Sequence, residues 1–303
     1  MAVDDCEQKA GMVKLLEYNA KMSLNKKTGS RFKKEEYAAF RHFLEATCGI
    51  VLGDNKDYLI DSRLRKILKE RDVGSLNELV MNVSGFGTGD LKQRVIDAMT
   101  TNETLWFRDG HPFDYFTGTL LEELHAKGQP VSIWSAASSS GQEPYSVSIC
   151  IEEFIKRKNS SFLSNAKILA TDICQEILSQ AQTGSYDMLS LNRGMSESRL
   201  KQHFKEINKG QWEVKQEIKN RVDFRKYNLK DSFAGLGQFD VVFCRNVLIY
   251  FSSELQNEIL RKIHGVLKPG GYLFLGGSET PRELNKLFNI QFYSPGIVYK
   301  KKA

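Results

Sequence analysis

Residues 101 to 110 read TNETLWFRDG, which mixes hydroxyl, amide, aromatic and charged side chains without a helical or strand period. A second unusual stretch runs from Ser135 to Tyr145 and reads SAASSSGQEPY. Its small side chains would let a ligand approach the backbone. Pro144, which we expect at the first helical position, would leave the free amides of a helix N-terminus facing that ligand. Taken alone, the second stretch is equally consistent with a plain turn between a strand and a helix.

Polar residues also follow two other predicted strands. Asp172 ends the stretch ILATD, and Arg245 and Asn246 come directly after the apolar run VVFC. In open α/β sheets, ligands bind at the carboxyl ends of the strands, where an acidic residue can accept hydrogen bonds from ribose hydroxyls. The alternative for Asp172 is a cap on the next helix. The position of all three residues favours a ligand site.

The stretch from Ser135 to Tyr145 limits the type of cofactor, because it lacks a glycine-rich fingerprint. Only Gly141 is present where a dinucleotide fingerprint would have three glycines. A nicotinamide cofactor is therefore disfavoured, because its pyrophosphate needs a close glycine approach. An adenosine-bearing ligand without a pyrophosphate turn indicates S-adenosylmethionine. We expect no metal centre, since the histidines are scattered and the cysteines (Cys6, Cys48, Cys150, Cys174 and Cys244) form no CxxC pair.

The elements that must position these residues begin with a helical region. From Lys33 to Thr100, apolar residues recur at helical spacing, and glycines separate the helical stretches. We predict a small helical domain over residues 30–100, with no strand. Residues 1–29 are polar and end in NKKTGS, so we expect a tail there. Residues 101–303 then form the second domain.

Beyond residue 130, apolar strands alternate with helices, which predicts an α/β fold with a doubly wound parallel sheet. A KPGG turn at 268–271 is predicted to end the last helix. Two further strands around Pro295-Gly296 are expected as a hairpin at one edge. The other predicted elements are strand 131–136, helix 144–156, strand 167–173, helix 175–182, strands 222–226 and 239–244, helix 252–267 and strand 272–276.

One interval, between the helix at 175–182 and the strand at 222–226, departs from this alternation. Phe204 to Ile207 and Gln211 to Ile218 are predicted as two strands joined by the turn Asn208-Lys209-Gly210. We therefore predict a small antiparallel β insert over about residues 190–221. Insertions on a rigid scaffold often carry recognition.

The composition is that of a soluble globular protein, with 41% hydrophobic and 26% charged residues, and no apolar run approaches the roughly 18 residues of a membrane span. Unpaired cysteines favour a reducing cytoplasm. The segment Arg63 to Arg71 contains five basic residues in nine. It can be a solvated helix face or a docking surface for an acidic partner, protein or nucleic acid.

Six motifs in register resemble those of the chemotaxis receptor glutamate O-methyltransferases, the CheR family. Asn102-Glu103-Thr104 followed by Phe107-Arg108-Asp109 resembles the family's N-E-T-x-F-F-R motif. The resemblance extends from about residue 33 to the end of the chain, and its departures at Leu105-Trp106 and Gln142 remove no presumed contact. The other five motifs are Gly141 to Ser146, Ala170 to Ile173, Tyr227 to Leu229, Cys244 to Phe251 and Leu267 to Gly271.

The resemblance implies a doubly wound, Rossmann-like methyltransferase sheet with a small all-helical N-terminal domain. It implies methylation of glutamate side chains on the cytoplasmic domain of chemotaxis receptors, with S-adenosylmethionine leaving as S-adenosylhomocysteine. Arg108 and Tyr250 would face the methyl-transfer centre, with Arg108 holding the carboxylate of either the acceptor or the cofactor. The implied cofactor contacts are Asn102, Thr104, Arg108, Glu143, Asp172, Asn228, Leu229, Arg245 and Asn246.

The resemblance also implies that the β insert and a basic helix, through Arg63, Arg65, Lys66 and Lys69, contact the receptor. We expect a monomer, with no nucleic-acid partner and no membrane insertion. The short turn at 208–210 favours an enzyme that does not bind a receptor's C-terminal pentapeptide. Two rival functions are a catalytically inactive receptor-binding module of the same fold and a nicotinamide-dependent oxidoreductase.

Overall fold

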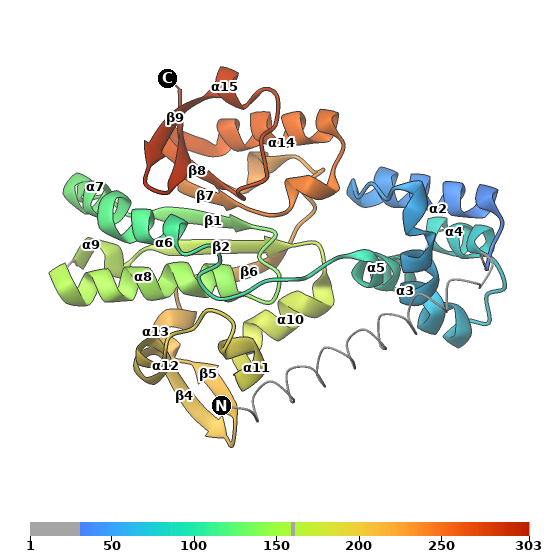
Figure 1. The fold of residues 1–303 in the computed structure, drawn as a ribbon, viewed down its shortest axis with the longest axis horizontal. Helices are drawn as coiled ribbons and strands as arrows, with labels where there is room; N and C mark the ends of the chain where they lie inside the picture. The colour runs from blue at the N-terminus through green and yellow to red at the C-terminus, as the bar shows by residue number, and fades with distance from the viewer. Residues whose placement is uncertain (1–30, 86, 159–160, 303) are drawn as a thin grey trace, which may run out of the picture.

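A computed structural model of the chain describes residues 31–85, 87–158 and 161–302. The tail that we predicted over residues 1–29 lies outside this range. None of the helices in the described residues combines the length and the apolar character needed to cross a membrane. The helices α2 to α5 form one group at the end of a larger body built around a sheet (Figure 1).

The first group consists of α2 (Lys34–Cys48), the 3-10 turn η1 (Asp54–Lys56), α3 (Asp57–Glu70), α4 (Leu76–Ser84) and α5 (Gly89–Met99). Residues 31–85 and 87–100 contain no strand, which confirms the predicted helical bundle. Its core is formed by apolar residues at helical spacing, among them Phe40, Leu44, Leu64 and Leu68. The helix α2 ends at Gly49, whose positive φ of 82° suits a glycine at the C-terminal cap.

The larger body contains a seven-stranded sheet of order β6-β2-β1-β7-β8-β10-β9. The first five strands in this order are parallel, and the hairpin β9–β10 adds two antiparallel strands at one edge, as predicted. The strands are β1 (Ser132–Ala136), β2 (Lys167–Asp172), β6 (Val222–Lys226), β7 (Phe239–Cys244), β8 (Leu267–Leu275), β9 (Phe288–Tyr293) and β10 (Gly296–Lys301).

Helices cover both faces of this sheet, so neighbouring residues of one strand enter different cores. In β7, Val241 and Phe243 pack with α8 (Gln142–Lys158), whereas Val242 and Cys244 pack with α14 (Ser253–Val266). Both faces of the inner strands are therefore buried, which explains their continuous apolar runs. The doubly wound fold class is confirmed. The short helix α9 (Ser161–Ser164) and α10 (Gln175–Thr183) complete the connections on either side of β2.

The structure corrects two of the predicted boundaries. Helix α8 begins at Gln142, so Pro144 is the third helical residue and not the first. The residues of the KPGG turn lie inside β8, where the register shifts between the pairs Phe239–Leu267 and Val241–Tyr272. The helix α14 does stop before this turn, at Val266, as predicted, but the turn itself forms an irregular start of the strand, with Gly270 at a φ of 70°.

Three consecutive helical elements before β1 were not predicted. They are α6 (His111–Tyr115), the π-helical turn η2 (Phe116–Leu120) and α7 (Leu121–Lys127). Their buried side chains include Phe113, Phe116, Leu120 and Leu124. The spacing of these residues carried a helical signal that the sequence interpretation overlooked.

The inserted β unit is confirmed as a separate antiparallel sheet of order β3-β5-β4. Its strands are β3 (Ser185–Asp187), β4 (Phe204–Asn208) and β5 (Gln211–Val214), and the helices α11 (Met188–Leu191) and α12 (Glu197–His203) lie between β3 and β4. The predicted second strand, Gln211 to Ile218, was too long, because α13 (Gln216–Lys219) follows Val214. The third strand, β3, was not predicted.

Candidate functional site

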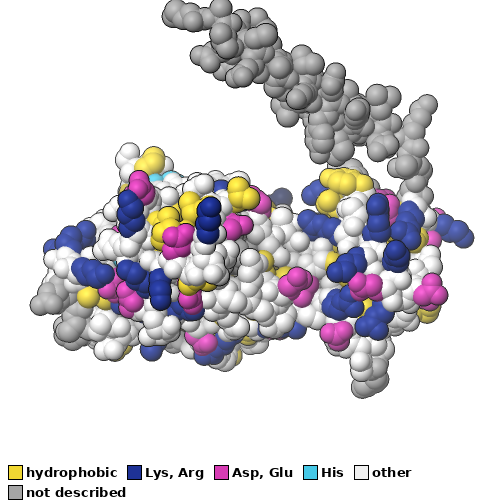
Figure 2. All heavy atoms as spheres, turned by 90° about the horizontal axis from the view of Figure 1, so that it is seen from below, with side chains coloured by type: hydrophobic (Ala, Val, Ile, Leu, Met, Phe, Trp, Pro, Cys, Tyr) yellow, Lys and Arg dark blue, Asp and Glu magenta, His cyan; other side chains and the backbone are white. Residues whose placement is uncertain are grey.

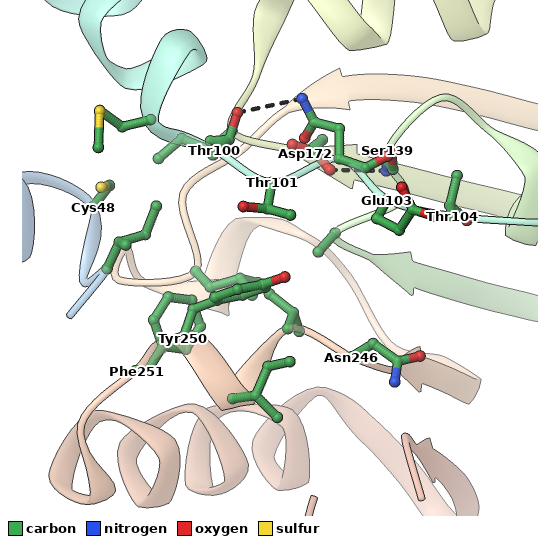
Figure 3. Close-up of a pocket in the computed structure, with 18 of the residues that line it drawn as sticks. Cys48, Thr100, Thr101, Glu103, Thr104, Ser139, Asp172, Asn246, Tyr250 and Phe251 are labelled. Atoms are coloured by element: carbon green, nitrogen blue, oxygen red, sulfur yellow. Dashed lines mark hydrogen bonds between the residues drawn. The ribbon is translucent and has the colours of Figure 1, made fainter. Parts of the chain in front are cut away.

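A cleft lies between the helical group and the carboxyl ends of β1, β2 and β7. Its empty volume is about 1280 Å³ when the solvent-filled space at its mouth is included. Figure 3 shows Asp172, Ser139 and Thr101 on one side of the cleft and Tyr250 and Phe251 on the other. The structure brings every predicted site residue to this cleft: Asn102, Thr104, Arg108, Glu143, Asp172, Asn228, Leu229, Arg245, Asn246 and Tyr250.

Asp172 stands at the end of β2 with both carboxylate oxygens oriented by backbone amides. Its Oδ2 accepts from Ser139 N at 2.8 Å and its Oδ1 from Cys174 N at 3.0 Å. Burial raises the pKa of Asp172, and these hydrogen bonds oppose that shift. Each carboxylate oxygen can accept more than one hydrogen bond, so Asp172 keeps acceptor capacity for a ligand. Asp172 thus fits a pair of ribose hydroxyls.

The alternative function considered for Asp172 was to cap α10, but Asp97 is the residue whose carboxylate accepts from the first amides of that helix. Asp97 of α5 accepts from Gln175 N at 3.2 Å through Oδ1 and from Glu176 N at 3.4 Å through Oδ2. Two first-turn amides of α10 are therefore satisfied by the helical group. This contact also fixes one wall of the cleft against the other.

The segment from Thr101 to Gly110 is anchored by its two aromatic residues. Trp106 is fully buried and Phe107 nearly so. Phe107 and Asp109 have positive φ values of 48° and 69°, so the chain turns sharply on both sides of Arg108. Within the described residues, the guanidinium of Arg108 makes one hydrogen bond, from Nη1 to Glu103 O at 3.3 Å. Most of its five N–H donors remain available to a ligand.

Arg245 holds the backbone of that turn in place. Its Nη2 donates to Arg108 O at 2.8 Å and to Asp109 Oδ2 at 2.7 Å, and its Nη1 donates to Glu143 Oε2 at 3.1 Å. Only 1% of the Arg245 side chain is exposed. Burial raises the pKa of Glu143, and the neighbouring guanidinium of Arg245 opposes this. These bonds suit Arg245 to orienting Arg108 more than to contacting a ligand itself.

Asn228 joins the two walls of the cleft. Its Nδ2 donates to Thr47 O near the end of α2 at 2.9 Å, while Lys230, two residues further along the chain, donates through Nζ to Glu45 O at 3.0 Å. The segment that follows β7 makes a similar contact with the helical group, because Val51 N donates to Tyr250 O at 2.8 Å. The helical group is thus tied to the loops that follow β6 and β7.

Arg63 belongs to the basic stretch that we expected to face a receptor, but its guanidinium is engaged at the cleft. Its Nη1 donates to Met99 O at 2.8 Å and Thr100 O at 3.0 Å, and its Nη2 donates to Thr101 Oγ1 at 3.0 Å. Arg65, Lys66 and Lys69 remain exposed on α3. Figure 2 shows Lys and Arg side chains gathered on the helical group, at the right of that view.

No group of three His, Cys, Asp or Glu side chains in the described residues is arranged to hold a metal ion. The four cysteines of that part of the chain, Cys48, Cys150, Cys174 and Cys244, are free and buried. Burial raises the pKa of the Cys48 thiol to about 11 and that of Cys150 to about 12, so both thiols stay protonated and unreactive near neutral pH.

Comparison with protein families identifies the two parts. Residues 102–296 match the CheR methyltransferase SAM-binding domain, and residues 35–100 match the CheR methyltransferase all-alpha domain. The chain belongs to the CheR methyltransferase family. The resemblance expected from the six motifs is thereby confirmed. The part that matches the SAM-binding domain contains all ten predicted site residues.

Three relatives illustrate how far the similarity extends. The chain is 51% identical over 269 residues to chemotaxis protein methyltransferase 1 of Pseudomonas aeruginosa, covering 88% of this chain and 98% of the relative. It is 48% identical over 269 residues to chemotaxis protein methyltransferase Cher2 of Pseudomonas putida, with the same coverage. It is 32% identical over 259 residues to the chemotaxis protein methyltransferase of Salmonella typhimurium, covering 84% of this chain and 87% of the relative.

The residues of the cleft fit S-adenosylmethionine, the cofactor of this family. Asp172 offers acceptors for ribose hydroxyls, and the small side chains of Ala137, Ser138 and Ser139 line the adjacent wall. Arg108 offers N–H donors suited to a carboxylate.

Proposed function

We propose that this CheR family member methylates glutamate side chains of chemotaxis receptors, forming methyl esters with S-adenosylmethionine as methyl donor. The observation that carries the proposal is the convergence of ten residues, from separate segments of the chain, on one cleft of the SAM-binding domain. The names of the relatives support a chemotaxis substrate. We further propose that the enzyme acts as a monomer on the cytoplasmic part of the receptor.

The chemistry needs no general base. A glutamate with an ordinary pKa of about 4.3 is already a carboxylate at neutral pH. When bound, the cofactor supplies an electrophilic methyl group on a sulfonium. The protein must orient the acceptor and exclude water, and correct orientation can contribute about 7–11 kcal/mol. A cleft that offers oriented donors and acceptors without a base suits this reaction.

Arg108 is the residue that we assign to a carboxylate at the reaction centre. Its backbone is held by Arg245, and a guanidinium can grip a carboxylate with two parallel hydrogen bonds. Two carboxylates compete for it, that of the acceptor and that of the cofactor's methionyl group. Arg108→Lys separates them: a raised receptor KM indicates the acceptor, and weaker S-adenosylhomocysteine binding indicates the cofactor.

Receptor recognition is assigned to two surfaces. Arg65, Lys66 and Lys69 form an exposed basic face on α3, which suits an acidic helical partner. The β insert is the second surface. Its hairpin turn between β4 and β5 spans only Lys209 and Gly210, which favours recognition without a C-terminal receptor pentapeptide. Reversing charges on α3 is expected to raise the receptor KM and leave cofactor affinity unchanged.

The experiment has two stages. Calorimetry first measures S-adenosylhomocysteine binding, and labelled methyl transfer to receptor-containing membranes follows. Alkali-labile release of labelled methanol would identify a methyl ester, whereas an alkali-stable product would rule out glutamate esterification. Binding without transfer would indicate the inactive receptor-binding module, and absence of binding would overturn the cofactor assignment.

A further inference from the structure

Glu279 lies beyond β8 and is almost fully buried, with 4% of the residue exposed. Its carboxylate accepts four backbone N–H groups. Oε2 accepts from Gly276 N at 2.6 Å and Asn246 N at 2.8 Å, and Oε1 accepts from Val247 N at 2.8 Å and Leu248 N at 2.7 Å. All acceptor positions of the carboxylate are therefore in use, and none is left for a ligand.

Three of these four donors belong to the loop that follows β7. This loop contains Asn246, at a positive φ of 60°, and leads into the 3-10 turn η4 (Leu248–Tyr250). Three successive N–H groups that converge on one point need an acceptor there, because buried and unpaired donors are costly. Glu279 supplies that acceptor and so determines the conformation of the loop.

The end of β8 is shaped for this contact. A Cβ atom on Gly276 would lie 2.8 Å from Glu279 Oε2 and 2.7 Å from Asn246 Nδ2, closer than real Cβ atoms approach. Asn246, Val247, Ile249 and Tyr250 line the cleft, and Glu279 does not. Glu279 therefore influences the cleft indirectly, by its hydrogen bonds to the loop that lines it.

We propose that Glu279 is a positioning residue for methyl transfer, which fixes Asn246 and Tyr250 at the cofactor cleft. The proposal rests on the proposed function of that cleft. A charged acceptor strengthens each of the four hydrogen bonds, which a neutral side chain of the same shape cannot do. The alternative is a brace that stabilises the fold without affecting the cleft.

The first test is Glu279→Gln, which keeps the size of the side chain but replaces one oxygen by an NH2 group that faces two N–H donors. We expect kcat for methyl transfer to fall at least tenfold and the Kd for S-adenosylhomocysteine to rise at least threefold. The matched control is Glu283→Gln, whose side chain pairs with Arg261 on α14 away from the loop. The control should keep both values within twofold of the wild type.

Three measurements separate positioning from simple stabilisation. Glu279→Asp keeps the charge and should fall between wild type and Glu279→Gln in kcat, and it serves as the test if the Gln variant does not fold. Combined with Tyr250→Phe, the Gln variant should lose less than the product of the two single effects, because both act on one loop. Hydrogen exchange at the amides of Asn246, Val247 and Leu248 should accelerate in Glu279→Gln.

A folded Glu279→Gln protein with wild-type kcat and affinity would overturn the proposal, as would fully independent effects in the double variant. Failure of the proposed function is distinguishable from this result, because the wild-type protein itself would then bind no S-adenosylhomocysteine or transfer no methyl group. Loop hydrogen exchange would still report on Glu279 in that case, and unchanged exchange would refute its effect on the loop.

Discussion

Gly194 provides a sharp test of how the insert supports the cleft. It lies between α11 and α12 with a φ of 100°, and a Cβ atom there would stand 2.0 Å from Trp106 O and 3.0 Å from Trp106 C. The neighbouring Arg193 O accepts from Trp106 N at 3.0 Å, and the Arg193 side chain pairs with Glu103. Gly194→Ala must therefore distort the backbone contact that holds the Trp106 segment.

Two terms make up the expected destabilisation. A Cβ atom in the left-handed region costs about 1–2 kcal/mol, and overpacking against a fixed neighbour costs about 1–3 kcal/mol more. Gly210 in the β4–β5 turn is the matched control, because its φ is 77° and a Cβ atom there meets nothing within 4 Å. Gly210→Ala should therefore show only the first term. The difference between the two variants isolates the contact with Trp106.

Thermal unfolding and calorimetry measure the consequences. For domains of this size, 1 kcal/mol corresponds to about 2–4 °C in Tm, so Gly194→Ala should unfold at least about 2 °C below Gly210→Ala. Because Trp106 lies two residues before Arg108, the same variant should weaken S-adenosylhomocysteine binding, while the control should not. Equal Tm values for the two variants, with equal affinities, would refute the reasoning.

Three further predictions concern the cleft and the fold. Arg108→Ala should lower methyl transfer to receptor membranes at least about tenfold, since a charged hydrogen bond contributes about 1.5–3 kcal/mol; wild-type turnover would contradict the assignment. Asp172→Ala should weaken S-adenosylhomocysteine binding by calorimetry, and unchanged affinity would argue against the ribose contact. Burial alone would raise the pKa of Glu153, but His203 and Arg199 lower it from 4.5 to about 2. This stabilisation is present above pH 4.5 and lost as the pH falls towards 2, so Glu153→Gln should flatten the dependence of Tm on pH below 4.5.

The inner strands β1, β2 and β7 were predictable because each contains a short, buried apolar run between turn signals. The bounds of β6 and β7 agree with the sequence interpretation, and α10 differs by one residue. The three-residue strand β3 was beyond such reasoning, since it pairs with β5, which follows it by more than twenty residues. A strand this short has too few residues to show a period, and pairing over that distance leaves no local signal.

The residues of the site likewise differ in whether the sequence alone reveals them. Asp172, Arg245 and Asn246 could be selected because polar residues at the ends of apolar strands are conspicuous. Glu279 and the inward orientation of Arg63 could not, because each acts on backbone groups from distant parts of the chain. A basic run predicts an exposed face, and only the packed fold shows which of its members turns inward.

The segment Thr101 to Gly110 is held by all three parts of this protein. The helical group holds the start of the segment through Arg63, the insert holds Trp106 through Arg193 and Tyr186, and the sheet holds Arg108 through Arg245. The helical group and the insert are also the surfaces that we assign to the receptor. A receptor bound at either of these proposed surfaces would contact a part of the protein that supports the segment carrying Arg108.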